Sequence, residues 1–288
     1  MAEIDFKDQN RRIGVPELKS IASEIREDIL RMLSEAKSGH PGGSLSCTDI
    51  LVSLYFSKMR HDPKNPKWND RDRLLLSKGH AAPALYSVLS KCGYFPKEEL
   101  MTLRKMNSRL QGHPDPKKLP GVEIPGGPEG IGLSEGIGMA LAARIDKKPI
   151  RVYVITGDGE LDEGEVWEAA MAAAKFKLDN LVAIVDQNGL QQEGPTANIM
   201  PSDPVSAKFK AFNWNVLEID GNNIQEVLNA LDQADNAKGI PTAIVAKTKK
   251  GKGVSFMEGK VEYHSKTISA EVLDKAIAEI RNSSKEGA

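Results

Sequence analysis

The stretch VYVITGDGELDEG, residues 152–164, decides the fold. An apolar run ends in a turn flanked by glycines, which is how a buried strand opens into a phosphate-binding loop in α/β proteins. The same loop carries five acids, Asp158, Glu160, Asp162, Glu163 and Glu165. A loop shaped for an anion but filled with carboxylates needs an explanation of its own.

Apolar runs and helical patterns alternate around this stretch. The runs RVYVITG (151–157), NLVAIVD (180–186), NVLEID (215–220) and PTAIVAKT (241–248) read as buried strands. Helical patterns are expected near residues 136–144, 164–176 and 224–234. This alternation predicts an α/β fold, a doubly wound, mostly parallel sheet with helices on both faces.

The segments outside this core are expected to be helices and loops. A helix is expected from residue 15 until SGHPGG (38–43) ends it, then a second from Ser46 to about Met59, with further helical patterns at 81–91 and 97–106. A Gly/Pro-rich segment (111–134) reads as a functional or disordered loop. After a polar loop, residues 269–288 form an amphipathic helix with a frayed tail, and we expect residues 1–288 to form one domain.

Composition excludes several classes of protein. The chain has 288 residues, 40% of them hydrophobic, and its 39 basic and 40 acidic residues leave no net field to hold nucleic acid or an anionic membrane. The N-terminus MAEIDFKDQNRR lacks the apolar centre of a signal peptide, so a cytoplasmic location is expected. Cys47 and Cys92 form no CxxC motif and cannot make a disulfide framework, and we expect Cys47 to be a buried, inert thiol.

Two oxygen-bearing side chains follow neighbouring strands. Asp158 follows the strand that ends near Thr156, and Asn188 follows the next strand about thirty residues later. Parallel strands end at the same edge of a sheet, so both side chains should converge there, as hard oxygen ligands suited to Mg²⁺ or Ca²⁺. Such a cation can bridge the acids and a diphosphate. The alternative is a capped helix N-terminus, with Asp162 as N-cap and Glu163 and Glu165 facing the helix dipole, which we prefer for Glu165.

Four of the five histidines lie in polar or Gly/Pro-rich loops: His40, His80, His113 and His264. Imidazole is the natural group for proton transfer near neutral pH, so these histidines are candidates for catalysis. Zinc is disfavoured because neither HxH nor HExxH occurs. His61, in KMRHDPKN, is expected to be an ordinary surface residue.

Six segments, taken in order and spacing, resemble the N-terminal diphosphate-binding domain of transketolase. They are SGHPGG (38–43), WNDRDRLLLSKGHAAPALY (68–86), QGHPD (111–115), GVEIPGGPEGIGLSEGIGMALA (121–142), GDGELDEGEVWEAA (157–170) and VDQNGLQ (185–191). The resemblance covers nearly the whole chain. It implies a thiamine diphosphate-binding fold, with thiamine diphosphate and Mg²⁺, or Ca²⁺, as cofactors.

The resemblance also implies roles for individual residues. Asp158, Asn188 and the backbone carbonyl of Leu190 would hold the metal, and Gly159 would let the backbone approach the diphosphate, near His80. The substrate-facing residues would be His40, His113 and His264. The implied cofactor-binding set also includes Gly127, Gly157 and Glu163, and Glu163 would join Glu168 in an acidic network near the subunit interface.

Full transketolases continue through two further domains, and this chain stops after the first. In the family, the second domain supplies a Glu that contacts the aminopyrimidine ring of the cofactor. We therefore expect a partner subunit carrying the pyrimidine-binding domain, in a heterotetramer with two of each chain. A truncated sequence is the alternative, although the terminal helix and polar tail read as a natural end.

One departure from the family pattern concerns Glu129. Transketolases commonly read GxLGQG where this chain has GPEGIG (127–132), so a carboxylate replaces an apolar residue expected beside the cofactor rings. A carboxylate is costly to bury there without a partner. The hypothesis is that Glu129 hydrogen-bonds the aminopyrimidine or its neighbourhood, and the alternative is an exposed loop carboxylate. The lysines of KTKKGKG (247–253) read as a solvated active-site loop.

The predicted function is transfer of a two-carbon ketol unit from a ketose phosphate to an aldose, active only with the partner subunit. One alternative is a related ketol-forming synthase, of the deoxyxylulose-phosphate type or specialised for an unusual sugar. The other is a cofactor-binding subunit without catalysis. Sugar phosphates are the expected substrates, with neither nucleic acid nor membrane as a partner.

Overall fold

The computed structural model describes residues 4–8, 11 and 13–286 of the chain, with side-chain exposure given as far as residue 283. Residues 1–3, 9–10 and 12 lie outside the described residues, and part of the N-terminal stretch read as unlike a signal peptide falls there. The last two residues of the expected frayed tail, 287 and 288, also lie outside them. Within these residues, no helix combines the length and the apolar character needed to cross a membrane.

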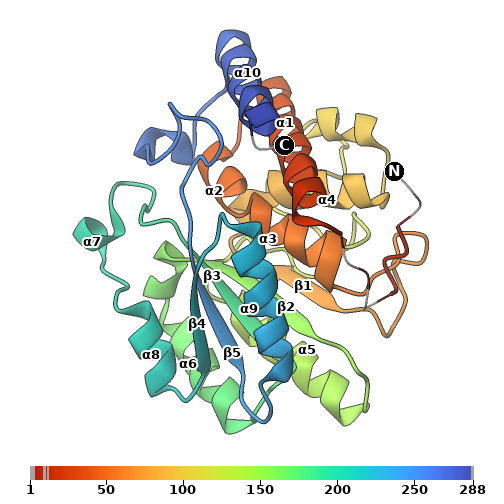
Figure 1. The fold of residues 1–288 in the computed structure, drawn as a ribbon, viewed down its shortest axis with the longest axis vertical. Coiled ribbons are helices and arrows are strands. Elements are labelled where there is room, and N and C mark those ends of the chain that lie inside the picture. The colour runs from red at the N-terminus through yellow and green to blue at the C-terminus, as the bar shows by residue number, and fades with distance from the viewer. Residues whose placement is uncertain (1–3, 9–10, 12, 287–288) are drawn as a thin grey trace.

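Five parallel strands form the sheet, in the order β1-β2-β3-β5-β4 (Figure 1). The four expected strands are present as β2 (Val152–Gly157), β3 (Leu181–Gln187), β4 (Asn215–Asp220) and β5 (Thr242–Lys247). The expectation that all four are buried is wrong for β4, because it is an edge strand in which no residue is buried. The edge strand β1 (Arg73–Leu76) was not predicted. It has only four residues and follows the charged run WNDRD, so it shows no strand pattern of its own, yet it pairs with β2 from Arg73 opposite Val152.

Helices cover both faces of the sheet, which confirms the doubly wound α/β fold (Figure 1). One face carries α1 (Val15–Ala36), α3 (Thr48–Ser53), α4 (Ala82–Cys92) and α9 (Ile224–Asn236), and α10 (Ala270–Glu286) packs along α1. The other face carries α5 (Gly132–Ile145), α6 (Gly164–Lys175) and α8 (Val205–Ala211). Successive strand residues alternate between the two cores: Tyr153 and Ile155 join the first, and Val152 and Val154 the second.

Two helical predictions need correction. The helix expected from Ser46 to about Met59 begins later, as α3 at Thr48, and ends in a π-helical turn (Leu54–Lys58). A separate helix that was not predicted, α2 (Pro41–Ser46), precedes it, and the chain leaves helical geometry between the two at Cys47. The pattern at residues 97–106 forms only a 3₁₀ helix (Lys97–Thr102), which ends where Leu103 turns extended and Arg104 adopts a positive φ of 58°. The remaining short helices are Gly79–Ala81, Gly159–Asp162, Thr196–Ile199 and Val261–His264.

The C-terminal helix α10 continues to Glu286, so the described part of the expected tail is helical. The Gly/Pro-rich loop (111–134) lies against the body of the protein. Its apolar residues Leu119, Val122 and Ile124 are buried, and the Tyr86 hydroxyl donates a hydrogen bond to the Gln111 carbonyl at 2.9 Å. Residues 111–131 therefore pack against the body of the protein without a regular helix or strand, and α5 begins at Gly132.

His61 is buried, with 1% of its surface exposed, so its assignment to the surface was wrong. Its Nε2 lies 2.9 Å from the Tyr55 carbonyl, which can only accept, and its Nδ1 lies 3.1 Å from the Tyr94 hydroxyl. Burial lowers the pKa of His61 to about 4, so the ring is neutral and both nitrogens are used. The charged local sequence gave no sign of this tertiary contact.

Cys47 and Cys92 are both buried, as expected for Cys47.

Candidate active site

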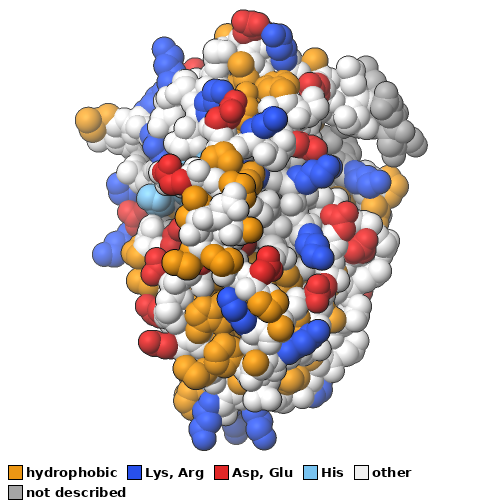
Figure 2. Space-filling view, turned by 90° about the vertical axis from the view of Figure 1, so that its left-hand side faces the viewer, with side chains coloured by type: hydrophobic (Ala, Val, Ile, Leu, Met, Phe, Trp, Pro, Cys, Tyr) orange, Lys and Arg blue, Asp and Glu red, His pale blue; other side chains and the backbone are white. Residues whose placement is uncertain are grey.

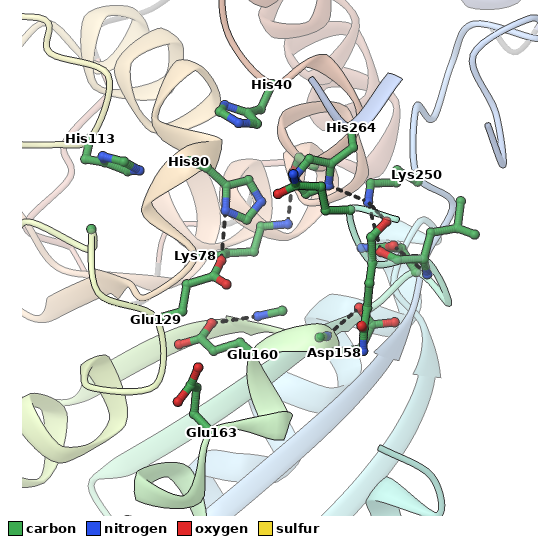
Figure 3. Close-up of a pocket in the computed structure, with 18 residues that line it drawn as sticks. His40, Lys78, His80, His113, Glu129, Asp158, Glu160, Glu163, Lys250 and His264 are labelled. Atoms are coloured by element: carbon green, nitrogen blue, oxygen red, sulfur yellow. Dashed lines mark hydrogen bonds and ion pairs between the residues drawn. The ribbon is translucent and has the colours of Figure 1, made fainter. Parts of the chain in front are cut away.

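A cavity of about 530 Å³ opens beyond the carboxyl ends of the strands (Figure 3). Every residue predicted from the sequence to act in catalysis, cofactor binding or metal binding lines it: His40, His80, His113, Gly127, Glu129, Gly157, Asp158, Gly159, Glu163, Asn188, Leu190 and His264. Six further residues complete the lining: Gly43, Lys78, Glu160, Gln191, Gln192 and Lys250. In the side view of Figure 2, a histidine comes to the surface beside acidic side chains, and hydrophobic side chains gather lower on the same face.

Asp158 is a buried carboxylate held by backbone donors. It is 2% exposed, and it accepts hydrogen bonds from the N–H groups of Gly159 at 3.0 Å and Gly189 at 2.6 Å. No lysine or arginine in the described part of the chain forms an ion pair with it. Burial raises its pKa to about 6. A buried carboxylate without a cation is the arrangement that a bound metal ion would stabilise.

Two further oxygen atoms come from the end of the neighbouring strand. Gly157 of β2 lies opposite Asp186 of β3, so the residues after them approach each other at one edge of the sheet. The side-chain oxygen of Asn188 accepts the Leu190 N–H at 3.1 Å, and the Leu190 carbonyl accepts a hydrogen bond from the Nζ of Lys250 at 2.9 Å. Among residues 4–8, 11 and 13–286, no three His, Cys, Asp or Glu side chains form a metal-binding group.

The acidic residues after Asp158 only partly follow the alternative interpretation, in which they cap the N-terminus of α6. The N-cap of α6 is Glu163 and not Asp162, and the Glu163 side chain makes no capping hydrogen bond. Asp162 instead accepts a hydrogen bond from the Gln191 side chain at 2.8 Å. Glu165 lies exposed in the first turn of α6, where a negative charge favours the helix dipole. Glu168 is exposed on α6 and does not line the cavity.

Three histidines stand together at the mouth of the cavity (Figure 3). The ring centres of His40, His80 and His264 lie 5.2 to 5.4 Å apart. Burial lowers the pKa of His40 to about 4 and of His264 to about 3, and it also lowers that of His113. The rings of His40 and His264 are therefore neutral near pH 7, each able to donate at one nitrogen and accept at the other. The buried Nδ1 of His40 has no hydrogen-bond partner within the described chain.

Lys250 was not predicted, and its assignment to a solvated loop was wrong. The side chain is buried, and Nζ lies 2.9 Å from the Leu190 carbonyl and 2.9 Å from Nδ1 of His264. Burial lowers its pKa to about 8, and the charge of Lys78 acts in the same direction. The Gly251 N–H donates to the Gly42 carbonyl at 3.0 Å, which draws this loop onto α2. That backbone contact is tertiary, so the lysine-rich sequence could not reveal it.

Lys78 was also missed, although it stands next to a glycine and a histidine in SKGH (77–80). Its Nζ donates to the Asp186 carboxylate and, at 2.9 Å, to the Gly43 carbonyl. Both members of the Lys78–Asp186 pair are buried. Although burial lowers the pKa of Lys78, the Asp186 carboxylate raises it above its usual value, so the ammonium stays charged. The pair supplies a fixed positive charge at the floor of the cavity.

Glu129 faces the cavity and is paired with a histidine. One carboxylate oxygen lies 2.9 Å from Nδ1 of His80, and the side chain is about two-fifths exposed. The hydrogen bond from His80 lowers the pKa of Glu129. The carboxylate is thus neither an unattached loop residue nor fully desolvated. One of its oxygens is engaged by His80 within the described chain.

The residues fit a metal ion that carries a diphosphate. Asp158 lacks a counter-ion, Asn188 and Leu190 add neutral oxygens, and Lys250 adds a positive charge on the same side. Mg²⁺ typically takes one or two protein oxygens and completes its octahedron with phosphate oxygens and water. At Gly159, a Cβ would lie 2.9 Å from the Gln191 side chain, so this position is crowded for any other residue.

Comparisons with known proteins identify the family of the chain. A family model described as the thiamine diphosphate binding domain of transketolase matches residues 18–283. A 6-deoxy-6-sulfo-D-fructose transketolase subunit from Clostridium sp. (strain MSTE9) is 45% identical over 94% of this chain and 98% of that protein. An apulose-4-phosphate transketolase subunit from Phocaeicola vulgatus is 41% identical over 92% of this chain and 94% of that protein.

Longer relatives match over part of their length. Human transketolase is 40% identical over 91% of this chain but only 42% of its own. The crystal structure of transketolase from Campylobacter jejuni superposes with a TM-score of 0.88 and 36% identity, covering 93% of this chain and 43% of that one. The similarity to these longer proteins is therefore confined to one part of each.

Proposed function

The chain belongs to the transketolase family, and from that premise we propose that its cavity takes the diphosphate end of thiamine diphosphate together with a Mg²⁺ ion. The chain is the N-terminal, thiamine diphosphate-binding subunit of a transketolase, a transferase that moves a two-carbon ketol unit from a ketose to an aldose. The observation that carries the metal proposal is the buried carboxylate of Asp158, which has no cationic partner among the described residues.

The metal would be held by the side-chain oxygens of Asp158 and Asn188 and by the Leu190 carbonyl. Ca²⁺, which also prefers oxygen ligands, is the alternative ion. When bound, thiamine diphosphate supplies the carbanion-stabilising chemistry, and the chain holds and orients the reacting groups. The Lys250 ammonium, 2.9 Å from the Leu190 carbonyl, would balance the charge of the diphosphate.

The glycines and His80 belong to the cofactor side of the cavity in this proposal. Gly127, Gly157 and Gly159 leave room for close approach of the diphosphate to the backbone, with His80 beside it. On the substrate side, His40, His113 and His264 bind hydroxyl groups and move protons. Support comes from the neutral state of His40 and His264 and from the unpartnered Nδ1 of His40. Glu163, on the rim, and Glu168 would face a neighbouring subunit.

Glu129 is proposed to hydrogen-bond the aminopyrimidine or a group next to it. Its carboxylate faces the cavity and retains one oxygen that is not paired with His80. Glu129→Gln in the reconstituted complex is expected to lower turnover by about 100-fold, because the amide cannot carry the negative charge. Turnover within about twofold of the unsubstituted complex would remove Glu129 from the mechanism.

The partner is proposed to be a second chain that carries the pyrimidine-binding domain, in an assembly of two copies of each. Two relatives that match along nearly their whole length are named as transketolase subunits, whereas human transketolase is more than twice as long. The chain would be copurified with the candidate partner, and cofactor binding and ketol transfer would be measured for the complex and for each chain alone. Only the complex is expected to bind the cofactor and to transfer the ketol unit. Full activity of this chain alone would contradict the partner proposal.

The donor sugar is proposed to be specialised, because the relatives at 45% and 41% identity are named for a sulfosugar and for apulose 4-phosphate. The complex would be assayed with xylulose 5-phosphate, 6-deoxy-6-sulfofructose and pyruvate as donors. Use of a ketose, in preference to pyruvate, is the expected result. Preference for pyruvate would favour a synthase of the deoxyxylulose-phosphate type, and no turnover with any donor would favour a non-catalytic subunit.

A further inference from the structure

Glu160 is a buried carboxylate that faces three neutral donors. It is 2% exposed, and it accepts hydrogen bonds from the Gly130 N–H and the Gly157 N–H, each at 2.9 Å, and from the Ser77 hydroxyl. No lysine or arginine in the described part of the chain forms an ion pair with it. Such a carboxylate costs free energy to bury and is retained where its hydrogen bonds serve a purpose.

Each of the three donors stands next to a group that lines the cavity. Ser77 directly precedes Lys78 and lies three residues before His80, Gly130 directly follows Glu129, and Gly157 directly precedes Asp158. One carboxylate therefore joins the loop after β1 and the end of β2 to the glycine loop of residues 126–132. No other side chain of the cavity connects these three segments within the described residues.

The glycine loop is fixed at both ends around Glu129. At one end, the Gly79 N–H donates to the Gly126 carbonyl at 2.9 Å, and a Cβ on Gly79 would overlap that carbonyl. At the other end, Glu160 holds the Gly130 N–H. Only three residues, 127–129, lie between these points, so the backbone of Glu129 has little freedom to shift.

Ser77 extends the same contact to the start of α5. Its hydroxyl donates to Glu160 and accepts the Gly132 N–H at 3.2 Å. Gly132 is the first residue of α5, and the residue at the N-cap, Ile131, offers no side-chain cap. Ser77 thus accepts a hydrogen bond from an N–H group in the first turn of α5, which has no partner within the helix. Because Glu160 holds the Ser77 hydroxyl, the pair also fixes the position where the glycine loop ends.

We propose that Glu160 is a positioning residue, which sets the Glu129–His80 contact by holding Gly130 on one side and Ser77 on the other. The inference rests on the proposed function of the cavity. Glu160 does not touch the reacting groups. It acts through the two loops that carry them, and its loss displaces Glu129 from Nδ1 of His80.

The main test is Glu160→Gln, which keeps the size of the side chain but replaces one acceptor oxygen with a donor. Either the Gly130 or the Gly157 N–H then faces an N–H₂ group, so either the glycine loop or the end of β2 must shift. Glu165→Gln, an exposed position on α6, is the matched control. The measured quantity, on the chain alone, is the ¹⁵N chemical shift of the His80 ring nitrogens. Their signals are assigned by their absence from the spectrum of His80→Gln, and the ring signals of His61 serve as an internal reference.

In Glu160→Gln, the His80 ring shifts should move toward those measured in Glu129→Gln, while the His61 shifts stay unchanged. In the reconstituted complex, kcat should fall about tenfold or more with cofactor affinity within about threefold, because displacement of a reacting group affects turnover first. His80 shifts identical to those of the unsubstituted chain would overturn the proposal and leave Glu160 as a stabilising residue only.

Ser77→Ala is the second variant, in case Glu160→Gln does not fold. It keeps the carboxylate and removes one of its donors, so the His80 shifts should move in the same direction. Unchanged His80 shifts in Ser77→Ala also overturn the proposal. The spectra need neither cofactor nor partner, so a complex without ketol transfer would contradict the proposed function while the spectra still decide the role of Glu160.

Discussion

Two buried aspartates, Asp72 and Asp158, stand at opposite ends of neighbouring strands and are held in different ways. Asp72, 4% exposed, precedes β1 and accepts hydrogen bonds from the Arg60 guanidinium at 3.0 Å and from the backbone N–H groups of Arg60 at 2.8 Å and Arg151 at 3.0 Å. Asp158, 2% exposed, follows β2 and accepts strong hydrogen bonds only from backbone N–H groups.

The difference separates a structural acid from a ligand-binding acid. The charge of Asp72 is neutralised inside the fold, so it has no capacity left for a ligand. The charge of Asp158 is left for a cation to neutralise. The histidines differ in the same way: both nitrogens of the His61 ring have protein partners, whereas Nδ1 of His40 has none within the described chain. Burial alone does not identify a site, because Asp72 and His61 are buried and do not line the cavity.

The largest expected effect is that of Asp158→Asn on cofactor binding. Removal of the negative charge should weaken binding of Mg²⁺ and thiamine diphosphate by about 1,000-fold or more, because the remaining ligands are neutral. The stability of the ligand-free chain should change little, because loss of the buried charge offsets the N–H₂ group that then faces one of the two backbone N–H donors. Isothermal titration of the reconstituted complex and urea denaturation of the chain measure the two quantities. If the variant binds the cofactor and Mg²⁺ normally, Asp158 is not a ligand-binding acid and does not differ from Asp72 in function.

Asp72→Asn should give the opposite result. It leaves the Arg60 guanidinium without its partner, so the free energy of unfolding should fall by about 3 to 5 kcal/mol. Affinity for the cofactor, measured where the variant is fully folded, should stay within about twofold of the unsubstituted protein. If Asp72→Asn loses cofactor affinity and keeps its stability, then Asp72 is not a purely structural acid, and the proposed difference from Asp158 is wrong.

The buried His61 should make stability depend on pH. Its pKa in the folded state, about 4, lies below the unfolded value of about 6.5, so the unfolded chain binds the proton first as the pH falls. The contribution is constant above about pH 6.5, and about 3 kcal/mol is lost between that pH and about pH 4. Urea titrations at several pH values measure the free energy of unfolding. In His61→Gln, its decrease between about pH 6.5 and pH 4 should be smaller by about 3 kcal/mol. An equally steep fall in the variant would contradict the buried neutral ring.

The smallest of these effects concerns Lys250. Lys250→Met should weaken thiamine diphosphate binding by about tenfold, through loss of one charge-assisted contact to the diphosphate. Lys249→Met is the matched control, because Lys249 is exposed and pairs with Glu258 at 3.3 Å. Equal affinities in the two variants would mean that the buried lysine faces the cavity without serving the cofactor.

The sheet and the placement of Asp158 and Asn188 were predictable from the sequence. Three of the four predicted strands, β2, β3 and β5, are mainly apolar runs, whereas β4 mixes apolar and polar residues. Parallel strands bring whatever follows them to one edge of the sheet. The loop histidines reach the same cavity because they belong to segments whose order resembles a known family. These predictions depend on local pattern or on family resemblance, and both are present in the sequence.

Other features depend on tertiary contacts that no local pattern encodes. The strand β1 has four residues, and its place is fixed by pairing with β2. Lys250 is buried because the Gly251 backbone docks on Gly42, and His61 is buried where two tyrosines contact its ring nitrogens. Glu160 looks like one acid among five in its loop, and only the positions of Ser77 and Gly130 distinguish it.

The most direct measurement is anomalous diffraction from crystals of the reconstituted complex loaded with Mn²⁺ and thiamine diphosphate. The account predicts one manganese peak between the side-chain oxygens of Asp158 and Asn188, in contact with the Leu190 carbonyl and with the diphosphate. Manganese or diphosphate bound elsewhere, with Asp158 still hydrogen-bonded only within the chain, would contradict it.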